Sequence, residues 1–141
     1  MIDDKKNRLS VIALVTMMML LLLVMYLLLF PFKTLEYEDQ YNMPVSNHQV
    51  KQGDVLLFHL CVCKYTNTPT TIGRRFVNDV VISLPPLVAT GQKGCKEYDV
   101  PVLIPDILPP GVYYLDMTAT NRVNPLREIT VHYRTEEFEI I

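Results

Sequence analysis

The 141-residue sequence predicts a transmembrane helix at the N-terminus, followed by one all-β domain built as an antiparallel sandwich. Two observations support this prediction. Residues 9–30 contain no charged side chain, whereas nine of the ten prolines and all five glycines fall after residue 43. In that second part they separate short runs rich in Val, Ile, Tyr and Thr, which is typical of a β domain. The length fits one domain with appendages.

The uncharged segment Leu9–Phe30 is long enough to cross a membrane. Its 22 residues would form a helix of about 33 Å, and the hydrocarbon core of a bilayer is about 30 Å thick. The segment has no polar face at the helical period, which argues against a buried helix of a soluble protein. A cleavable signal peptide has a shorter apolar stretch followed by small residues. Bulky residues fill Leu27–Phe32, so we expect an uncleaved anchor.

The charges beside this segment predict its orientation. Three basic residues precede it, Lys5, Lys6 and Arg8, whereas Lys33 is the only basic residue among the dozen that follow. Because Lys and Arg are retained in the cytoplasm, we expect a cytoplasmic N-terminus and an extracytoplasmic C-terminus. The predicted division is a cytoplasmic tip at 1–8, the transmembrane helix at 9–30, a stalk or a first irregular strand at 31–43 and an exported β domain at 44–141.

Apolar and polar side chains alternate along several runs of the exported part, and such alternation predicts strands with one buried face. The runs are 45–50, 55–66, 75–84, 98–104, 112–121 and 126–133, with 138–140 continuing after a bend. The expected buried faces carry Leu56, Phe58, Leu60 and Val62; Phe76, Val80, Ile82 and Leu84; Tyr98, Val100, Val102 and Ile104; and Tyr113, Leu115, Met117 and Ala119. Pro85-Pro86 should end the third run. Six or seven such strands imply two packed sheets.

The segment Pro109-Pro-Gly-Val-Tyr113 resembles the start of a late strand in immunoglobulin-like domains, where a turn with glycine is followed by a buried tyrosine. Leu115 stands where antibody domains have their second cysteine. The resemblance implies an immunoglobulin-like sandwich. It implies no function, because one fold carries many.

The exported part also resembles small single-anchor membrane proteins encoded by tailed bacteriophages. The segments that carry this resemblance are Cys63-Lys-Tyr-Thr66, Gly94-Cys95, Leu108-Pro-Pro-Gly-Val-Tyr113, Val123-Asn-Pro-Leu-Arg127 and Thr135-Glu-Glu-Phe138. The resemblance implies a bacterial inner membrane and a periplasmic domain, with no activity attached. The exported part has no N-x-[ST] glycosylation site, which agrees with a bacterial setting.

Three cysteines are the most informative residues for chemistry. Cys61 and Cys63 lie two apart on one strand and point to the same face, too far apart to bridge easily. In an oxidising compartment we therefore expect Cys95 to pair with one of them. We favour Cys63, which leaves Cys61 as a free thiol. Such a bridge would stabilise the fold by about 3 to 4 kcal/mol.

A metal site is the competing interpretation of the same residues. His59, Cys61 and Cys63 share a strand face as H-x-C-x-C, and with Cys95 they could hold Cu(I) or Zn(II). Membrane-anchored copper chaperones of cytochrome oxidase assembly are similar in topology and in having a C-x-C pair. This chain departs from their C-F-C-F pattern, because Val62 and Lys64 flank the pair here. We expect a structural disulfide and no cofactor.

Composition and motifs argue against several other classes of protein. A net charge of −2 does not suit binding to a nucleic-acid backbone. The sequence lacks G-x-S-x-G, H-E-x-x-H and a Gly-rich phosphate loop, so we expect no enzyme. The segment Tyr65–Arg75 is predicted to be a loop at the end of the sandwich, and such loops often carry recognition. Its candidate binding residues are Thr70, Thr71, Arg74 and Arg75.

The sequence therefore favours a membrane-tethered, non-enzymatic interaction module, encoded by a phage, whose partners are the membrane and a protein of the envelope or the phage. One alternative is a membrane-anchored protein that handles copper or zinc. Another is a virion or lysis-related membrane component that acts through oligomers of its helix. The helix has no small-xxx-small motif, which does not favour close pairing of helices.

Overall fold

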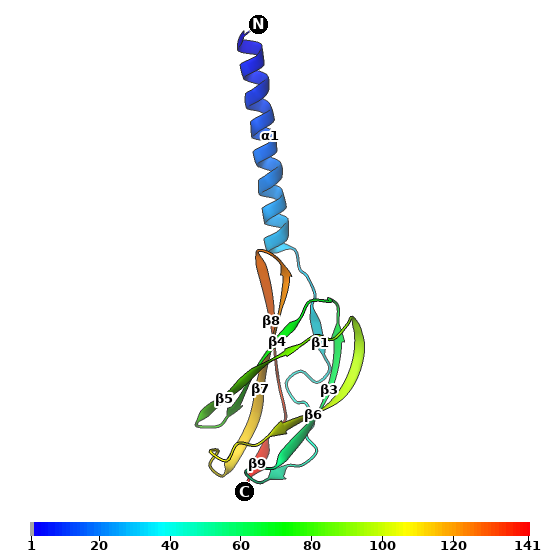
Figure 1. Cartoon of the computed structure of the whole chain (residues 1–141), viewed down its shortest axis with the longest axis vertical. Helices are drawn as coiled ribbons and strands as arrows, with labels where there is room; N and C mark the ends of the chain where they lie inside the picture. The colour runs from blue at the N-terminus through cyan, green and yellow to red at the C-terminus, as the bar shows by residue number, and fades with distance from the viewer. Residues whose placement is uncertain (1) are drawn as a thin grey trace. The chain divides into compact units, whose positions relative to one another are not determined.

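The computed structural model describes residues 2–141 and consists of an N-terminal apolar helix and a mostly β domain (Figure 1). The chain divides into two compact units. The first is Met1–Phe32 with Asn124–Arg127, and the second is Lys33–Val123 with Glu128–Ile141. Of the predicted cytoplasmic tip 1–8, Met1 lies outside the described residues. The general prediction of an apolar helix before a β domain is confirmed.

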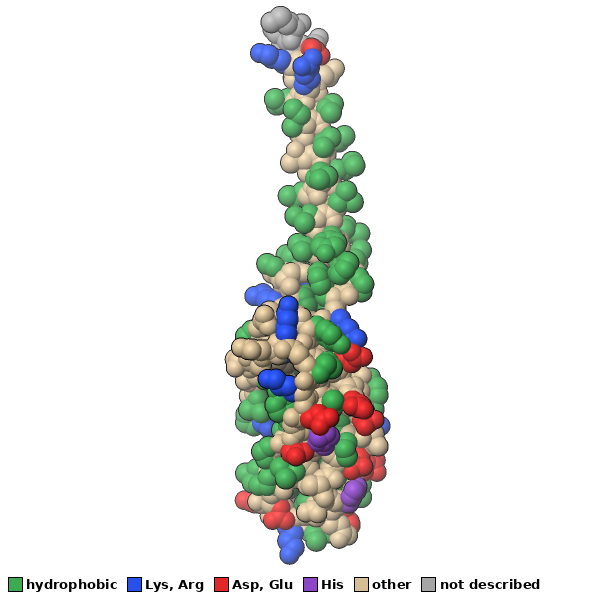
Figure 2. Space-filling view, turned by 90° about the vertical axis from the view of Figure 1, so that its right-hand side faces the viewer, with side chains coloured by type: hydrophobic (Ala, Val, Ile, Leu, Met, Phe, Trp, Pro, Cys, Tyr) green, Lys and Arg blue, Asp and Glu red, His purple; other side chains and the backbone are tan. Residues whose placement is uncertain are grey.

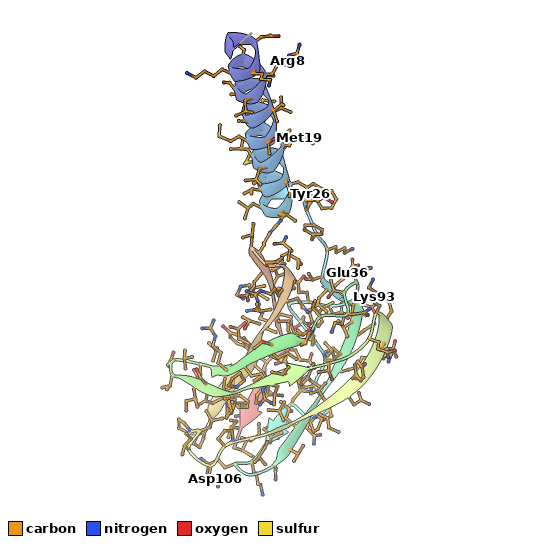
Figure 3. All side chains as sticks on the ribbon, turned by 45° about the horizontal axis from the view of Figure 1, so that its top comes forward. Arg8, Met19, Tyr26, Glu36, Lys93 and Asp106 are labelled. Atoms are coloured by element: carbon orange, nitrogen blue, oxygen red, sulfur yellow. A yellow bond between two sulfur atoms is a disulfide. The ribbon has the colours of Figure 1, made fainter. Side chains whose placement is uncertain are left out.

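Helix α1 (Ile2–Leu29) starts earlier than the predicted segment 9–30. The polar residues before Leu9 continue the helix, and Asp4 pairs with Arg8 one turn later at 3.4 Å. Within α1, Asp4–Leu29 is long and apolar enough to span a bilayer, judged by length and composition. Its side chains project in all directions around the axis, as Figure 3 shows.

The described residues form nine strands. They are β1 (Leu35–Tyr37), β2 (Gln49–Val50), β3 (Val55–Lys64), β4 (Thr70–Val77), β5 (Val81–Ala89), β6 (Gly94–Leu103), β7 (Gly111–Asn124), β8 (Arg127–Arg134) and β9 (Phe138–Ile140). One sheet has the order β1-β3-β6, and the other has the order β2-β9-β7-β4-β5 with β8 beside β7. The pairs β1–β3, β3–β6, β4–β5, β4–β7 and β7–β9 are antiparallel. Strands β2 and β9 are parallel, so the second sheet is mixed rather than purely antiparallel.

The core lies between the two sheets, and alternation along the strands correctly identified half of its buried hydrophobic residues. Tyr98, which was also expected inside, is 44% exposed. Leu56 and Phe58 of β3 are buried, as are the four predicted positions of β7. Phe76 of β4 meets Phe138 of β9 edge to face, with ring centroids 6.2 Å apart. These contacts join strands that are distant in the sequence, because β9 enters the sheet beside β7.

Tyr113 and Tyr133 are the two largest fully buried side chains of this core. The Tyr113 hydroxyl donates a hydrogen bond of 2.9 Å to the carbonyl oxygen of Pro109, four residues earlier. The ring is therefore held at both ends, by apolar packing and by the turn that precedes β7. A buried hydroxyl needs such a partner, since leaving it unpaired costs about 1 to 3 kcal/mol.

Of the two interpretations of residues 31–43, the irregular strand is correct and the stalk is wrong, because most of this segment belongs to the β domain. Strand β1 pairs with β3, which places Leu35 and Tyr37 in the core. Met43 is fully buried and forms a parallel bridge with Thr135. The rings of Tyr37 and Tyr133 stack with centroids 4.1 Å apart. The domain therefore starts near residue 33 rather than at residue 44.

The predicted single strand 75–84 is also wrong. The chain reverses at Asn78–Val80, where the Asn78 amide donates to the Val80 carbonyl, so this region forms the hairpin β4–β5. Val80 is consequently exposed in the turn instead of buried. Pro85-Pro86 lie inside β5 and do not end it. Proline is tolerated there because β5 is an edge strand.

Candidate functional site

The outer face of the β3–β6 pair gathers the residues that the sequence singled out. Alternation turns five side chains of β3 outward, and the antiparallel register sets a residue of β6 opposite each of them. We call this surface the β3–β6 outer face. Its pairs are Val55 with Leu103, Leu57 with Pro101, His59 with Asp99, Cys61 with Glu97 and Cys63 with Cys95.

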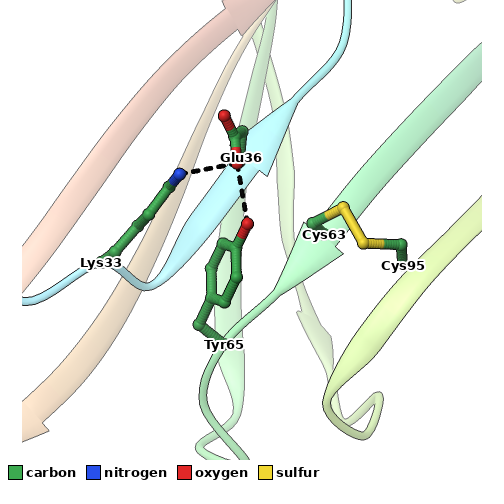
Figure 4. Close-up of a disulfide and its surroundings, with 5 residues drawn as sticks. All are labelled: Lys33, Glu36, Cys63, Tyr65 and Cys95. Atoms are coloured by element: carbon green, nitrogen blue, oxygen red, sulfur yellow. Dashed lines mark hydrogen bonds and ion pairs between the residues drawn. A yellow bond between two sulfur atoms is a disulfide. The ribbon is translucent and has the colours of Figure 1, made fainter.

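Cys63 and Cys95 are joined by a disulfide, which is the pairing that the sequence favoured (Figure 4). The two residues are 32 positions apart in the chain but directly opposite each other in the register. Cys61 is a free thiol. Beside the bridge, Glu36 of β1 pairs with Lys33 at 2.7 Å and accepts a hydrogen bond of 2.8 Å from the Tyr65 hydroxyl. Close to the bridge, the start of the β domain is thus bound to the residue that follows β3.

The disulfide removes two ligands from the proposed metal site. Cys63 and Cys95 are consumed by their bond, so a site made of His59, Cys61, Cys63 and Cys95 does not form in the oxidised chain. Among the described residues, no group of three or more His, Cys, Asp or Glu side chains is placed to hold a metal ion. Two ligands from one strand do not complete the tetrahedral sites that zinc prefers.

His59 and Cys61 occupy an acidic environment instead. The His59 Nδ1 atom lies 3.0 Å from the Asp99 carboxylate, and this hydrogen bond raises the pKa of His59. Glu38 raises the pKa of the Cys61 thiol by hydrogen bonding, and burial and Glu97 act in the same direction. A thiol held protonated is a poor nucleophile and a poor metal ligand. Figure 2 shows acidic side chains grouped around a histidine on one face of the domain.

The other end of the β3–β6 outer face is apolar. Val55 is 55% exposed, Leu57 39% and Leu103 61%, and Val55 lies directly opposite Leu103. Neighbouring apolar side chains left in water over several residues commonly mark a site of association. The outer face therefore combines an apolar patch with an acidic rim that contains Asp99 and Glu97.

The four residues proposed for a binding loop lie in strand β4, so the prediction of a loop at these positions is wrong. Thr70 is buried and its hydroxyl accepts a hydrogen bond of 2.8 Å from Asn121. Arg75 pairs with Asp116 across the β4–β7 ladder, at 2.6 Å. Arg74 donates to the Pro85 carbonyl at 3.1 Å. Thr71 faces away from the core and lies opposite Thr120 and Val88. These contacts serve the sheet itself rather than an exposed loop.

A cavity of about 320 Å³ lies between the two sheets, and the sequence analysis did not identify it. Its wall is mainly apolar, with Leu60 and Val62 from β3 and Val100 from β6. Tyr37 and Tyr133 also line it, and burial raises the pKa of both hydroxyls, that of Tyr133 to about 12. A hollow flanked by basic side chains is visible in Figure 2.

The lysine at position 64 is the sequence feature that could have indicated this cavity. It follows Leu60 and Val62 on the inward face of β3, so period-two alternation alone places a lysine inside. It is only 9% exposed, and its ammonium group donates a hydrogen bond of 2.8 Å to the Gly91 carbonyl. Burial lowers the pKa of Lys64.

Comparison with known proteins gives no evidence on the function of this chain. No family model matches the chain, and no curated protein matches it. Among solved structures, the chain is similar to the sporulation control protein Spo0M from Bacillus subtilis, with 10% identity and a TM-score of 0.45. The match covers 77% of this chain and 50% of Spo0M, so the chain spans about half the length of that protein. This similarity is structural and distant, and the candidate site depends on the chain's own residues.

Proposed function

We propose that this protein is a membrane-tethered, non-enzymatic interaction module that acts outside the cytoplasm. The observation that carries the proposal is a disulfide in the domain that follows an apolar helix of membrane-spanning length. Disulfides persist in oxidising compartments and are rare in the cytosol. The basic residues before the helix support the same orientation, with the β domain on the far side of the membrane.

We further infer an immunoglobulin-like arrangement for the β domain. The hydrogen bond from the Tyr113 hydroxyl to the Pro109 carbonyl supports this inference, because a similar bond from a late-strand tyrosine to the backbone a few residues upstream is typical of such domains. The parallel pair β2–β9 is compatible with it as a variation at the sheet edge. The resemblance to phage membrane proteins supports a bacterial inner membrane as the location.

The orientation can be tested by fusing reporters to the C-terminus. Alkaline phosphatase needs an oxidising compartment, so its fusion should be active, whereas a fusion to a cytoplasm-active reporter should be inactive. Replacing Lys5, Lys6 and Arg8 with glutamate removes the basic flank and should lower the phosphatase activity. Lys51→Glu and Lys93→Glu, which lie far from the helix in the sequence, should leave it unchanged. Activity from the cytoplasmic reporter alone would refute the proposed orientation, and a chain shortened by about 30 residues would reveal cleavage.

We infer that the apolar end of the β3–β6 outer face binds the protein partner in the envelope. Leu57 is the residue at the centre of this end, since it lies on the same face as Val55 and next to the Val55–Leu103 pair. Apolar side chains at the centre of an interface contribute most of the binding energy, and polar residues form the rim. The acidic side chains of Glu97 and Asp99 would form that rim.

Photocrosslinking can test this surface in intact cells of the natural host. A benzophenone amino acid at position 57 should give a defined crosslinked product with an envelope or phage protein. The same amino acid at position 51, in the exposed turn before β3, should not give that product. Adding Leu103→Asp to the position-57 variant should reduce the yield of the product about tenfold, because a charge is then buried in the contact. Equal products from both positions, or none from position 57, would refute this surface.

A further inference from the structure

We propose that the cavity between the two sheets binds a single alkyl chain ending in a carboxylate, and that the Lys64 ammonium pairs with this carboxylate. This inference concerns residues of the β domain only. It adds a small-molecule site to the proposed function and does not depend on the surface that would bind a protein partner.

The charge of Lys64 is not balanced by the protein. A lysine that is 9% exposed is unusual unless it is paired, because burying an ammonium group without a counterion is costly. Here the Gly91 carbonyl is a neutral partner for one of three N–H donors. Within the described part of the chain, no carboxylate acts on Lys64, and burial alone accounts for its lowered pKa. The ammonium group therefore has both the charge and the free donors to receive an anion.

The wall of the cavity selects an apolar chain for the rest of the ligand. Leu60, Val62 and Val100 line one side and Ile72 the other, and the two stacked tyrosines present ring carbons to it. The residues lining the cavity include two lysines, Lys64 and Lys96, and no acid. Its volume of about 320 Å³ is at the lower end of the range for sites that take small molecules. This size fits one chain of moderate length better than the two chains of a diacyl lipid.

The charge of Lys64 favours a ligand head group with one negative charge, such as a carboxylate. Lys64 is the buried lysine of the two, whereas Lys96 is exposed, so one buried positive charge matches one negative charge. The Gly91 carbonyl oxygen lies beside the ammonium group and would repel a second negative charge. A singly charged head on an alkyl chain satisfies both conditions, as in a fatty acid.

A purely structural role for Lys64 is the alternative. Its bond to Gly91 could serve only to hold the β5–β6 connection, residues 90–93, against β3. A structural lysine and a ligand-binding lysine differ in one measurable respect. If Lys64 binds the ligand, occupancy of the cavity depends on the charge of the ligand's head group. If Lys64 has only a structural role, it does not.

The test uses the full chain in nanodiscs of zwitterionic lipid and a laurate analogue that carries a diazirine near the end of its chain. After irradiation, labelled peptides are mapped by mass spectrometry. We expect labels in β3 and β6 in addition to labels in α1, which report probe dissolved in the bilayer and serve as the internal reference. Excess laurate should remove the labels in β3 and β6, and dodecyltrimethylammonium should not.

Matched variants then assign the binding to Lys64 and to the cavity. Lys64→Met keeps the length of the side chain without its charge and should lower labelling in β3 and β6, relative to α1, by about tenfold. Lys93→Met removes a charge from the β5–β6 connection, marked in Figure 3, that does not line the cavity, and should leave labelling unchanged. Ala89→Trp is placed at an exposed position of the lining, where a large ring should block the opening and abolish labelling.

Several results would overturn the proposal. They are labelling confined to α1, equal competition by the cationic amphiphile, and labelling in β3 and β6 that survives both Lys64→Met and Ala89→Trp. If Lys64→Met does not fold, which an absent Cys63–Cys95 bridge would reveal, Ala89→Trp and the charge of the competitor decide the result. Failure of the chain to enter nanodiscs would instead contradict the membrane tether, and binding could then be measured with the chain in solution.

Discussion

Replacing Cys63 with serine is expected to lower the free energy of unfolding of the β domain by about 3 to 4 kcal/mol. The bridge to Cys95 closes a segment of 32 residues that includes the whole β4–β5 hairpin, so its loss releases that segment in the unfolded chain. The chain-entropy relation gives this magnitude for a loop of that length. The domain is small, and a loss of this size is a large part of the 5 to 15 kcal/mol that holds typical domains together.

The measurement is urea denaturation of the full chain with and without the Cys63→Ser change, followed by circular dichroism. Cys61→Ser is the matched control, because it removes a cysteine from the same strand without touching the bridge, and it should change stability by less than about 1 kcal/mol. Thiol labelling of denatured, unreduced wild-type protein should find one thiol per chain, and three after reduction. Three thiols before reduction, together with bound copper or zinc, would contradict the disulfide and restore the metal hypothesis.

Truncating Tyr113 to alanine should cost about 3 to 5 kcal/mol. The ring is 1% exposed at the centre of the core, so its removal leaves a cavity that the surrounding strands cannot fill. The hydroxyl partner, the Pro109 carbonyl, also loses its hydrogen bond. Since the sequence alone placed this side chain inside, the experiment tests both the alternation along β7 and the turn before it.

Tyr113→Phe separates the two contributions to this loss. It keeps the ring and removes only the hydroxyl, so we expect a loss of about 1 kcal/mol. Urea denaturation of a fragment starting at Lys33 can measure both variants, and this boundary retains β1. A loss below about 1 kcal/mol for Tyr113→Ala would show that the ring is not buried. Equal losses for the two variants would show that the hydroxyl, rather than packing, holds the turn.

The alternation of apolar and polar residues predicted the buried face correctly where a strand is long and has one apolar face. Strands β3 and β7 have 10 and 14 residues, and their inward positions match the predicted ones. The same reasoning failed at 75–84 because apolar residues keep their spacing through the turn at Asn78. The choice between a stalk and a strand stayed open at 31–43, because the three residues of β1 carry too little periodicity to predict a strand.

The sequence predicted which residues of β3 share the candidate site, but not which residues of β6 lie opposite them. The sequence placed His59, Cys61 and Cys63 on one face, which the structure reproduces. The facing residues Asp99, Glu97 and Cys95 depend on the register between β3 and β6, and a shift of one residue would have turned them to the other side. The cavity depends on the spacing of two sheets, which no local pattern encodes. Lys64 alone gave a local hint of it, as a charged residue on the inward side.

The prolines in β5 and β6 have a consequence for how copies of the chain meet. Both strands are at the edge of their sheets, where unpaired backbone groups can recruit a strand from another molecule and start aggregation. Pro85 and Pro86 in β5 and Pro101 in β6 offer no N–H to such a neighbour. Lys96, with Glu97 and Asp99, adds charge along the β6 edge. If the chain is anchored in a membrane as proposed, neighbouring copies on one surface are hindered from pairing through their sheet edges, which leaves the faces of the sheets free for other contacts.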